Sequence, residues 1–123
     1  MSISNYYENK ILDHMVRGTT FTPPTVRLAL HTADPGEAGS TATEVTGGSY
    51  ARKNVTFGAA SGGTITLSSA ADFAGMPSST IKYVALWDST KSGNCLWSGA
   101  LTANKVVTTG DTLRITTITV SLD

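Results

Sequence analysis

The chain has 123 residues, a formal net charge of zero and a single cysteine. This length suits one domain and is too short for two ordinary ones, and one cysteine excludes an internal disulfide framework. Basic residues are scattered singly except for the pair Arg52-Lys53, whereas nucleic-acid binding needs clustered basic side chains. We therefore expect no nucleic-acid partner.

No apolar run approaches the roughly 18 residues that a membrane span needs, so no membrane partner is expected. Polar residues interrupt the N-terminal segment, which therefore lacks the apolar core of a signal peptide. Charged residues make up only 15% of the chain, and such weak electrostatic repulsion favours a subunit packed among neighbours. We expect the protein to remain in the cytoplasm where it is made and to leave only as part of a larger assembly.

Residues 5–17 are predicted to form the only helix. Asn5 is the candidate N-cap because Glu8 follows at the spacing of a capping box, and Gly18 is expected to end the helix. The apolar residues form two pairs spaced four residues apart, Ile11 with Met15 and Leu12 with Val16. This stripe predicts burial against the same domain or a neighbouring one.

The rest of the chain alternates between strand-like runs and turns. The runs are residues 25–31, 50–57, 64–68, 72–74, 81–87, 95–101 and 113–122. Residues 64–68 are expected to return as the hairpin partner of residues 50–57. Residues 81–87 are apolar on both faces, which predicts a central strand. The alternation changes phase within the last run, which predicts a bend that lets this segment serve two sheets.

These elements predict an all-β fold, an antiparallel β-sandwich of jelly-roll or Greek-key type with one short N-terminal helix. We expect residues 1–24 to form a helical arm and residues 25–123 to form the sandwich. The turn-rich stretch 34–48 is long for a compact domain, so it is expected to be exposed and to act as a contact arm.

The motifs that carry chemistry are missing, so we expect no enzyme, no cofactor and no metal. His14 and His31 have no second ligand at helical spacing, and we expect them to be surface or interface residues. No Gly-x-Ser-x-Gly motif and no phosphate-binding Gly-Lys-Ser motif is present. Cys95 is expected to be a buried, unreactive thiol.

A free carbohydrate-binding or enzymatic domain remains an alternative. Trp87 is expected in the strand core, but exposure of Tyr50 and Trp97 on one face would favour a carbohydrate platform.

Two segments resemble a known family. The first is Glu44 followed by Gly47-Gly48-Ser49-Tyr50-Ala51-Arg52, and the second runs through Val84-Ala85-Leu86-Trp87-Asp88 and Gly93 to Leu101. The chain is similar to a widespread family of small virion proteins of tailed phages, labelled as tail-fibre or capsid decoration proteins. This resemblance implies a structural virion part without catalytic residues.

The resemblance to trimeric β-sandwich decorations of short-tailed phages implies a capsid cement protein. We expect a homotrimer that binds the major capsid protein on the outer capsid surface. The alternative is a tail-fibre or tail-tip component that recognises the host, in which case a host surface glycan is a candidate partner. The candidate interface residues are Tyr6, Tyr7, Ile11, Met15, Phe21, Glu44, Tyr50 and Arg52.

Overall fold

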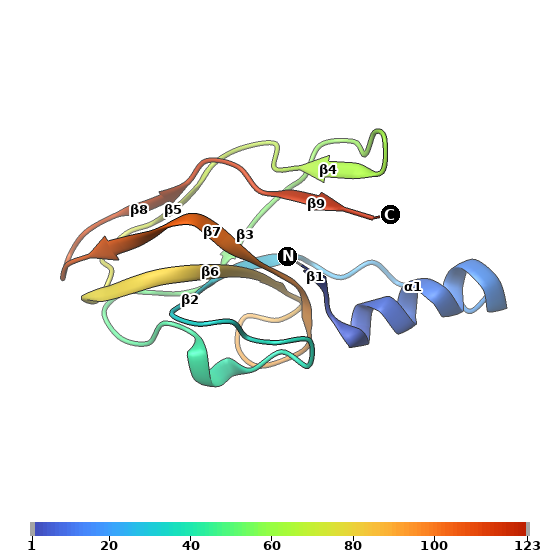
Figure 1. The fold of residues 1–123 in the computed structure, drawn as a ribbon, viewed down its shortest axis with the longest axis horizontal. Coiled ribbons are helices and arrows are strands. Elements are labelled where there is room, and N and C mark those ends of the chain that lie inside the picture. The colour runs from blue at the N-terminus through green and yellow to red at the C-terminus, as the bar shows by residue number, and fades with distance from the viewer. Residues whose placement is uncertain (1, 123) are drawn as a thin grey trace.

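The fold of the chain is described by a computed structural model that covers residues 2–122. Its main sheet has five antiparallel strands: β1 (Ser2–Ile3), β7 (Cys95–Val107), β6 (Ser79–Trp87), β2 (Arg27–His31) and β3 (Lys53–Asn54), in this spatial order. A second layer faces this sheet (Figure 1) and consists of two strand pairs: β4 (Thr64–Thr66) with β9 (Thr119–Ser121), and β5 (Ala71–Phe73) with β8 (Leu113–Ile115). The predicted antiparallel β-sandwich is confirmed.

The hydrophobic core lies between the two layers. Its buried side chains include Leu28, Leu30, Ile81 and Leu86 from the main sheet, and Phe73, Leu113 and Ile115 from the second layer. Each large apolar side chain stabilises the fold by roughly 1.5–3 kcal/mol when fully buried. The two layers therefore hold each other mainly by apolar burial.

Strand β6 is central, as its pattern predicts, because it pairs with β7 on one side and β2 on the other. Val84 and Leu86 point into the main core, while Ala85 and Trp87 belong to a second buried cluster with Ala29 and Cys95. This second cluster lies on the face of the main sheet that points away from the second layer, so another part of the chain must shield it from solvent.

The stretch 34–48 contributes to shielding this second cluster. Most of its residues are exposed, as expected, and its role as a contact arm stays a prediction. Its backbone is tied to β2, since Val45 N donates to Leu30 O at 3.0 Å and Thr32 N donates to Thr43 O at 2.9 Å. Gly39 lies so close to Cys95 that a Cβ there would be 2.4 Å from the Cys95 Cβ. The segment is long because it must cross the outer face of the sheet.

The final segment divides between two sheets, as the phase change predicts. β8 pairs with β5 and β9 pairs with β4, and Ile118 is buried in the break between them. The predicted strand over residues 50–57 is wrong: only β3 forms there, because Tyr50 and Arg52 turn towards Glu44. The predicted hairpin is reduced to one bridge between Phe57 and Leu67, since β4 pairs with β9.

The helix α1 (Asn5–Arg17) has the predicted bounds and ends at Gly18, which is left-handed with φ 71°. The predicted cap is wrong, however: Ser4 is the N-cap, and its Oγ accepts a hydrogen bond from Tyr7 N at 3.2 Å. Ser4 is buried because β1, just before it, pairs with Trp97 and Ser98 of β7. The segment predicted as an arm thus begins with a strand of the main sheet.

Candidate functional site

The N-terminal helix brings together five of the predicted interface residues. Tyr6 is exposed, Tyr7 and Ile11 are half-buried, and Met15 is largely exposed. Phe21 lies on the segment after the helix and packs back against it, with its ring centroid 5.6 Å from that of Tyr7. Two different surfaces therefore lie along the helix, on opposite sides of it.

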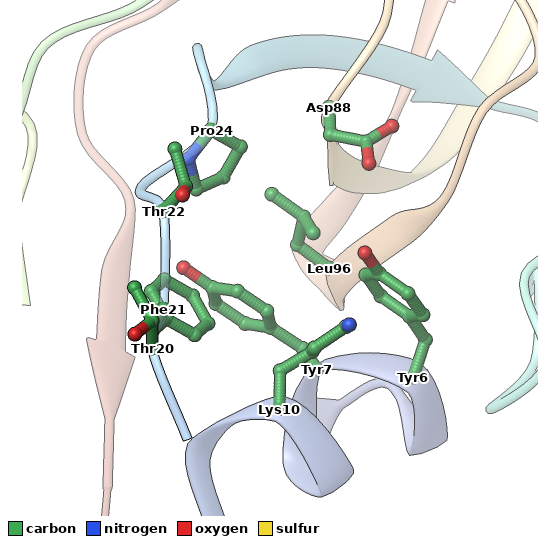
Figure 2. A pocket seen from close by; sticks show the side chains of 9 residues that line it. All are labelled: Tyr6, Tyr7, Lys10, Thr20, Phe21, Thr22, Pro24, Asp88 and Leu96. Carbon is green, nitrogen blue, oxygen red and sulfur yellow. The ribbon is translucent and has the colours of Figure 1, made fainter. Parts of the chain in front are cut away.

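The first surface is a hollow of about 290 Å³ between the first turns of α1 and the following segment (Figure 2). Its residues are Tyr6, Tyr7, Lys10, Thr20, Phe21, Thr22, Pro24, Asp88 and Leu96. Figure 2 shows the two tyrosines and Lys10 rising from the helix, while Asp88 comes from the opposite side. The Lys10 ammonium lies 5.6 Å from the centroid of the Tyr6 ring. We call this surface the aromatic hollow.

The second surface is an apolar groove of about 480 Å³ on the other side of α1. It is lined by Ser2, Ile3, Glu8, Ile11, Leu12, Met15, Ser121 and Leu122. Leu12, Met15, Val16 and Leu122 are large apolar side chains that stay exposed, and α1 buries none of its residues fully. We call Leu12, Met15, Val16 and Leu122 the apolar stripe, and nothing in the described chain covers it.

The other three predicted residues form a network inside the chain. The Arg52 guanidinium makes a two-pronged ion pair with Glu44, at 2.9 Å (Nε to Oε2) and 2.8 Å (Nη2 to Oε1). Its Nη1 also donates to the carbonyls of Ser89 and Ser92, both at 2.8 Å. The Tyr50 hydroxyl donates to Glu44 at 2.6 Å and accepts from Leu30 N at 3.0 Å. Glu44, Tyr50 and Arg52 therefore join the segment around residues 44–52 to β2 and to the loop after β6.

This network shifts the pKa values of its members. Burial raises the pKa of Glu44, but the hydrogen bonds from Arg52 and Tyr50 outweigh it and hold that pKa below its usual range. Burial and the bond to Glu44 both raise the pKa of Tyr50. At neutral pH, Glu44 is therefore a carboxylate, and Tyr50 is a neutral donor to it.

Sequence reasoning missed that His31 and Trp87 extend this network. His31 is fully buried rather than at the surface, so the expectation for it is wrong. Its Nδ1 lies 2.9 Å from Thr43 Oγ1, and its Nε2 accepts from Trp87 Nε1 at 3.3 Å. The Arg52 guanidinium stacks on the Trp87 ring at 4.3 Å. Every residue of β2 from Leu28 to His31 is buried. The apolar Ala29, two positions before His31 on the same face of the strand, could have signalled an inward His31, but the partners of His31 come from distant segments.

His31 gives the fold a pH dependence. Burial lowers the pKa of His31 from 6.5 to about 4, so the unfolded chain takes up a proton well before the folded chain does. Stability is therefore complete above the unfolded pKa and is lost as the pH falls towards the folded pKa. We predict that the free energy of unfolding falls by about 2 kcal/mol between pH 7 and pH 5 through His31.

Urea denaturation at several pH values measures this fall. The variant His31→Gln keeps an acceptor for Trp87 but does not titrate, so its stability should depend less on pH over that range. An unchanged pH slope in the variant would contradict the assignment to His31.

The thiol, the possible metal ligands and the remaining aromatic residues do not form a further site among residues 2–122. Cys95 is buried, as predicted, and burial raises the pKa of its thiol to about 11. Among residues 2–122, no three His, Cys, Asp or Glu side chains gather as metal ligands would. None of the helices in that region is long and apolar enough to cross a bilayer. Trp97 is buried and Tyr50 is hydrogen-bonded inside, so these two do not form the carbohydrate platform considered above.

Comparison with known families gives one match. A family model described as podophage GP4 fiber I protein gp80 matches residues 2–123. The chain belongs to this family. A search of curated proteins finds no match.

Membership in the gp80 family makes this chain a structural protein of a phage virion. The family takes its description from a fibre, which is not an enzyme class. The fibre description fits the tail-fibre alternative at least as well as capsid cement. The aromatic hollow and the apolar stripe are therefore surfaces of a virion protein.

Proposed function

We propose that the chain is a subunit of a tail fibre and attaches to its neighbours in the virion through the apolar stripe of α1. The observation that carries this proposal is the fibre description of a family that matches nearly the whole chain. The sandwich supplies a stable body, and the helix supplies a surface that residues 2–122 leave uncovered.

The chemistry of the apolar stripe supports a role in assembly. Interface cores are depleted in charge and enriched in Met and aromatic residues. Glu8 is the one charged residue among those that line the groove, and Met15 lies in its wall. Exposed apolar patches of this kind mark interaction sites in soluble proteins. A neighbouring virion protein with an apolar face is the partner that we propose.

The matched variants for this proposal are Leu12→Ser with Val16→Ser, and Val106→Ser as control. Val16 is 78% exposed and Val106, on β7, is 75% exposed, so both changes remove the same side chain from an open surface. Loss of two interface anchors should weaken binding by tenfold or more, which corresponds to about 1.4 kcal/mol. Quantitative mass spectrometry of purified particles measures how much of each variant is incorporated.

We expect the double variant to be nearly absent from particles and the Val106→Ser variant to be incorporated normally. Normal incorporation of both would contradict attachment through the apolar stripe. Circular dichroism of each purified variant confirms that the fold is intact.

The homotrimer is also part of this proposal, and its support is the low charge of the chain together with the resemblance to trimeric phage proteins. Sedimentation of the purified chain should give a trimer. A stable monomer at micromolar concentration would remove this part of the proposal.

The rival function is that of a cement protein bound to the major capsid protein. Stripping the chain from particles distinguishes a cement protein from a fibre subunit. A lower temperature of genome release would favour cement, whereas lost adsorption to host cells would favour the fibre.

A further inference from the structure

The aromatic hollow combines rings that pack in the fold with polar groups that face the hollow. Tyr7 packs partly against the hydrophobic core, whereas Tyr6 is exposed. The Tyr7 and Phe21 rings meet at an interplanar angle of 52°, and the Tyr6 ring is exposed nearby. Within residues 2–122, no protein group hydrogen-bonds to either tyrosine hydroxyl, and neither hydroxyl is sealed from solvent. Aromatic side chains with free polar tips are typical of surfaces that bind ligands with both apolar and polar faces.

The charged groups of the hollow are balanced and partly fixed. Asp88 Oδ1 accepts from Asn94 N at 2.8 Å, and Asp88 Oδ2 accepts from Asn94 Nδ2 at 3.0 Å. Each carboxylate oxygen can accept more than one hydrogen bond, so both can still receive a ligand hydroxyl. Lys10 places a cation in the same hollow. One cation and one carboxylate leave these side chains without net charge, so a ligand of either charge gains no net attraction, which favours a neutral ligand rich in hydroxyl groups.

We infer that the aromatic hollow binds one residue of a neutral saccharide. A pyranose ring presents C–H groups that pack on aromatic rings and hydroxyl groups that pair with Asp88, Lys10 and the tyrosine hydroxyls. The hollow, at about 290 Å³, lies at the small end of ligand pockets, which run from about 300 Å³ upwards. It therefore has room for a single sugar residue or a chain end rather than an extended oligosaccharide.

This inference goes beyond the proposed function, because a fibre subunit can be purely structural. The hollow is lined by Tyr6, Tyr7 and Lys10, whereas the groove is lined by Glu8, Leu12 and Met15. The two surfaces lie on different sides of α1, so a neighbour on the apolar stripe leaves the hollow open. Saccharide binding is tested on the purified chain, so its failure is distinguishable from failure of the assembly proposal.

The test is saturation-transfer NMR of the purified full chain with single neutral sugars: glucose, galactose, mannose, rhamnose and N-acetylglucosamine. We expect at least one sugar to bind with a dissociation constant in the millimolar range, which corresponds to about −4 kcal/mol. Inorganic phosphate, added as a charged probe, should not compete. Absence of transfer to every sugar, or competition by phosphate, would overturn the inference.

Three variants tie the binding to the hollow. Tyr6→Ala removes a ring and a hydroxyl and should weaken binding about tenfold, whereas Tyr6→Phe keeps the ring and should weaken it less. Asp88→Asn should weaken binding, while Asp72→Asn, at the exposed position of β5, serves as the matched carboxylate control and should not. Amide NMR spectra confirm that each variant is folded. Unchanged binding in Tyr6→Ala and Asp88→Asn would place the sugar elsewhere and overturn the inference.

Discussion

Replacing Arg52 with Ala is expected to lower the free energy of unfolding by about 3–5 kcal/mol. The Arg52 side chain is only 2% exposed, and its removal leaves the Glu44 carboxylate, 13% exposed, without its cation. The carbonyls of Ser89 and Ser92 lose a donor, and the Trp87 ring loses the guanidinium that covers it. A buried charge without its partner carries its full desolvation cost. Urea denaturation at pH 7 measures the change.

The chain contains a matched control for this variant. Arg114 makes a two-pronged ion pair with Asp72 at 2.7 Å and 3.0 Å, but both side chains are exposed to solvent. Exposed ion pairs contribute little because water screens them. Arg114→Ala should therefore leave stability nearly unchanged, and an equal loss in the two variants would contradict the role of burial.

Replacing Gly48 with Ala is expected to lower the free energy of unfolding by about 2–4 kcal/mol, since steric conflict and backbone strain combine. A Cβ at this position would lie 2.6 Å from Gly75 O and 2.9 Å from Pro77 N. Both atoms belong to the backbone, and Gly75 O also accepts the hydrogen bond from Ser49 N at 2.8 Å. The turn would have to open, which would move the start of the segment that carries Tyr50 and Arg52.

Gly62 provides the control for Gly48. Its φ of +61° is close to the +56° of Gly48, but no atom lies within 4 Å of a Cβ built there. Gly62→Ala should therefore cost only the strain of a left-handed alanine, about 1 kcal/mol. Thermal unfolding of the two variants measures the difference, and equal losses would show that the close approach to Gly75 is unimportant.

Local patterns in the sequence predict the elements whose causes are local. The bounds of α1 follow from its apolar spacing and from Gly18, and the central place of β6 follows from apolar residues on both of its faces. The division of the last segment between two sheets follows from a change of phase in its alternating apolar residues, because alternate residues of a strand face opposite sides of the sheet. In each case the determining residues lie within a few positions of one another.

The failures have causes that lie far away in the sequence. The attachment of the stretch 34–48 to the sheet was not predicted, because its contacts are with β2 and Cys95, which no local pattern reveals. Residues 50–57 alternate like a strand, but Arg52 bonds to Glu44 and to the loop after β6. Ser4 was missed as the helix cap because its burial depends on the pairing of β1 with β7.

For the candidate site, the sequence identified Tyr6, Tyr7, Met15 and Phe21 as interface candidates. It did not predict that they divide between two surfaces, because that depends on how α1 sits against the sandwich. The contribution of Asp88 to the hollow was not foreseen either, since it comes from a loop remote in sequence.

The proposal that the chain is a fibre subunit is tested most directly by its copy number and position in the particle. Quantitative mass spectrometry against the major capsid protein, with gold-labelled antibody to the chain in electron micrographs, measures both. We predict few copies relative to the capsid protein, with label confined to the tail vertex. Copies comparable in number to the capsid subunits, with label spread over the head, would contradict the fibre assignment and favour capsid cement.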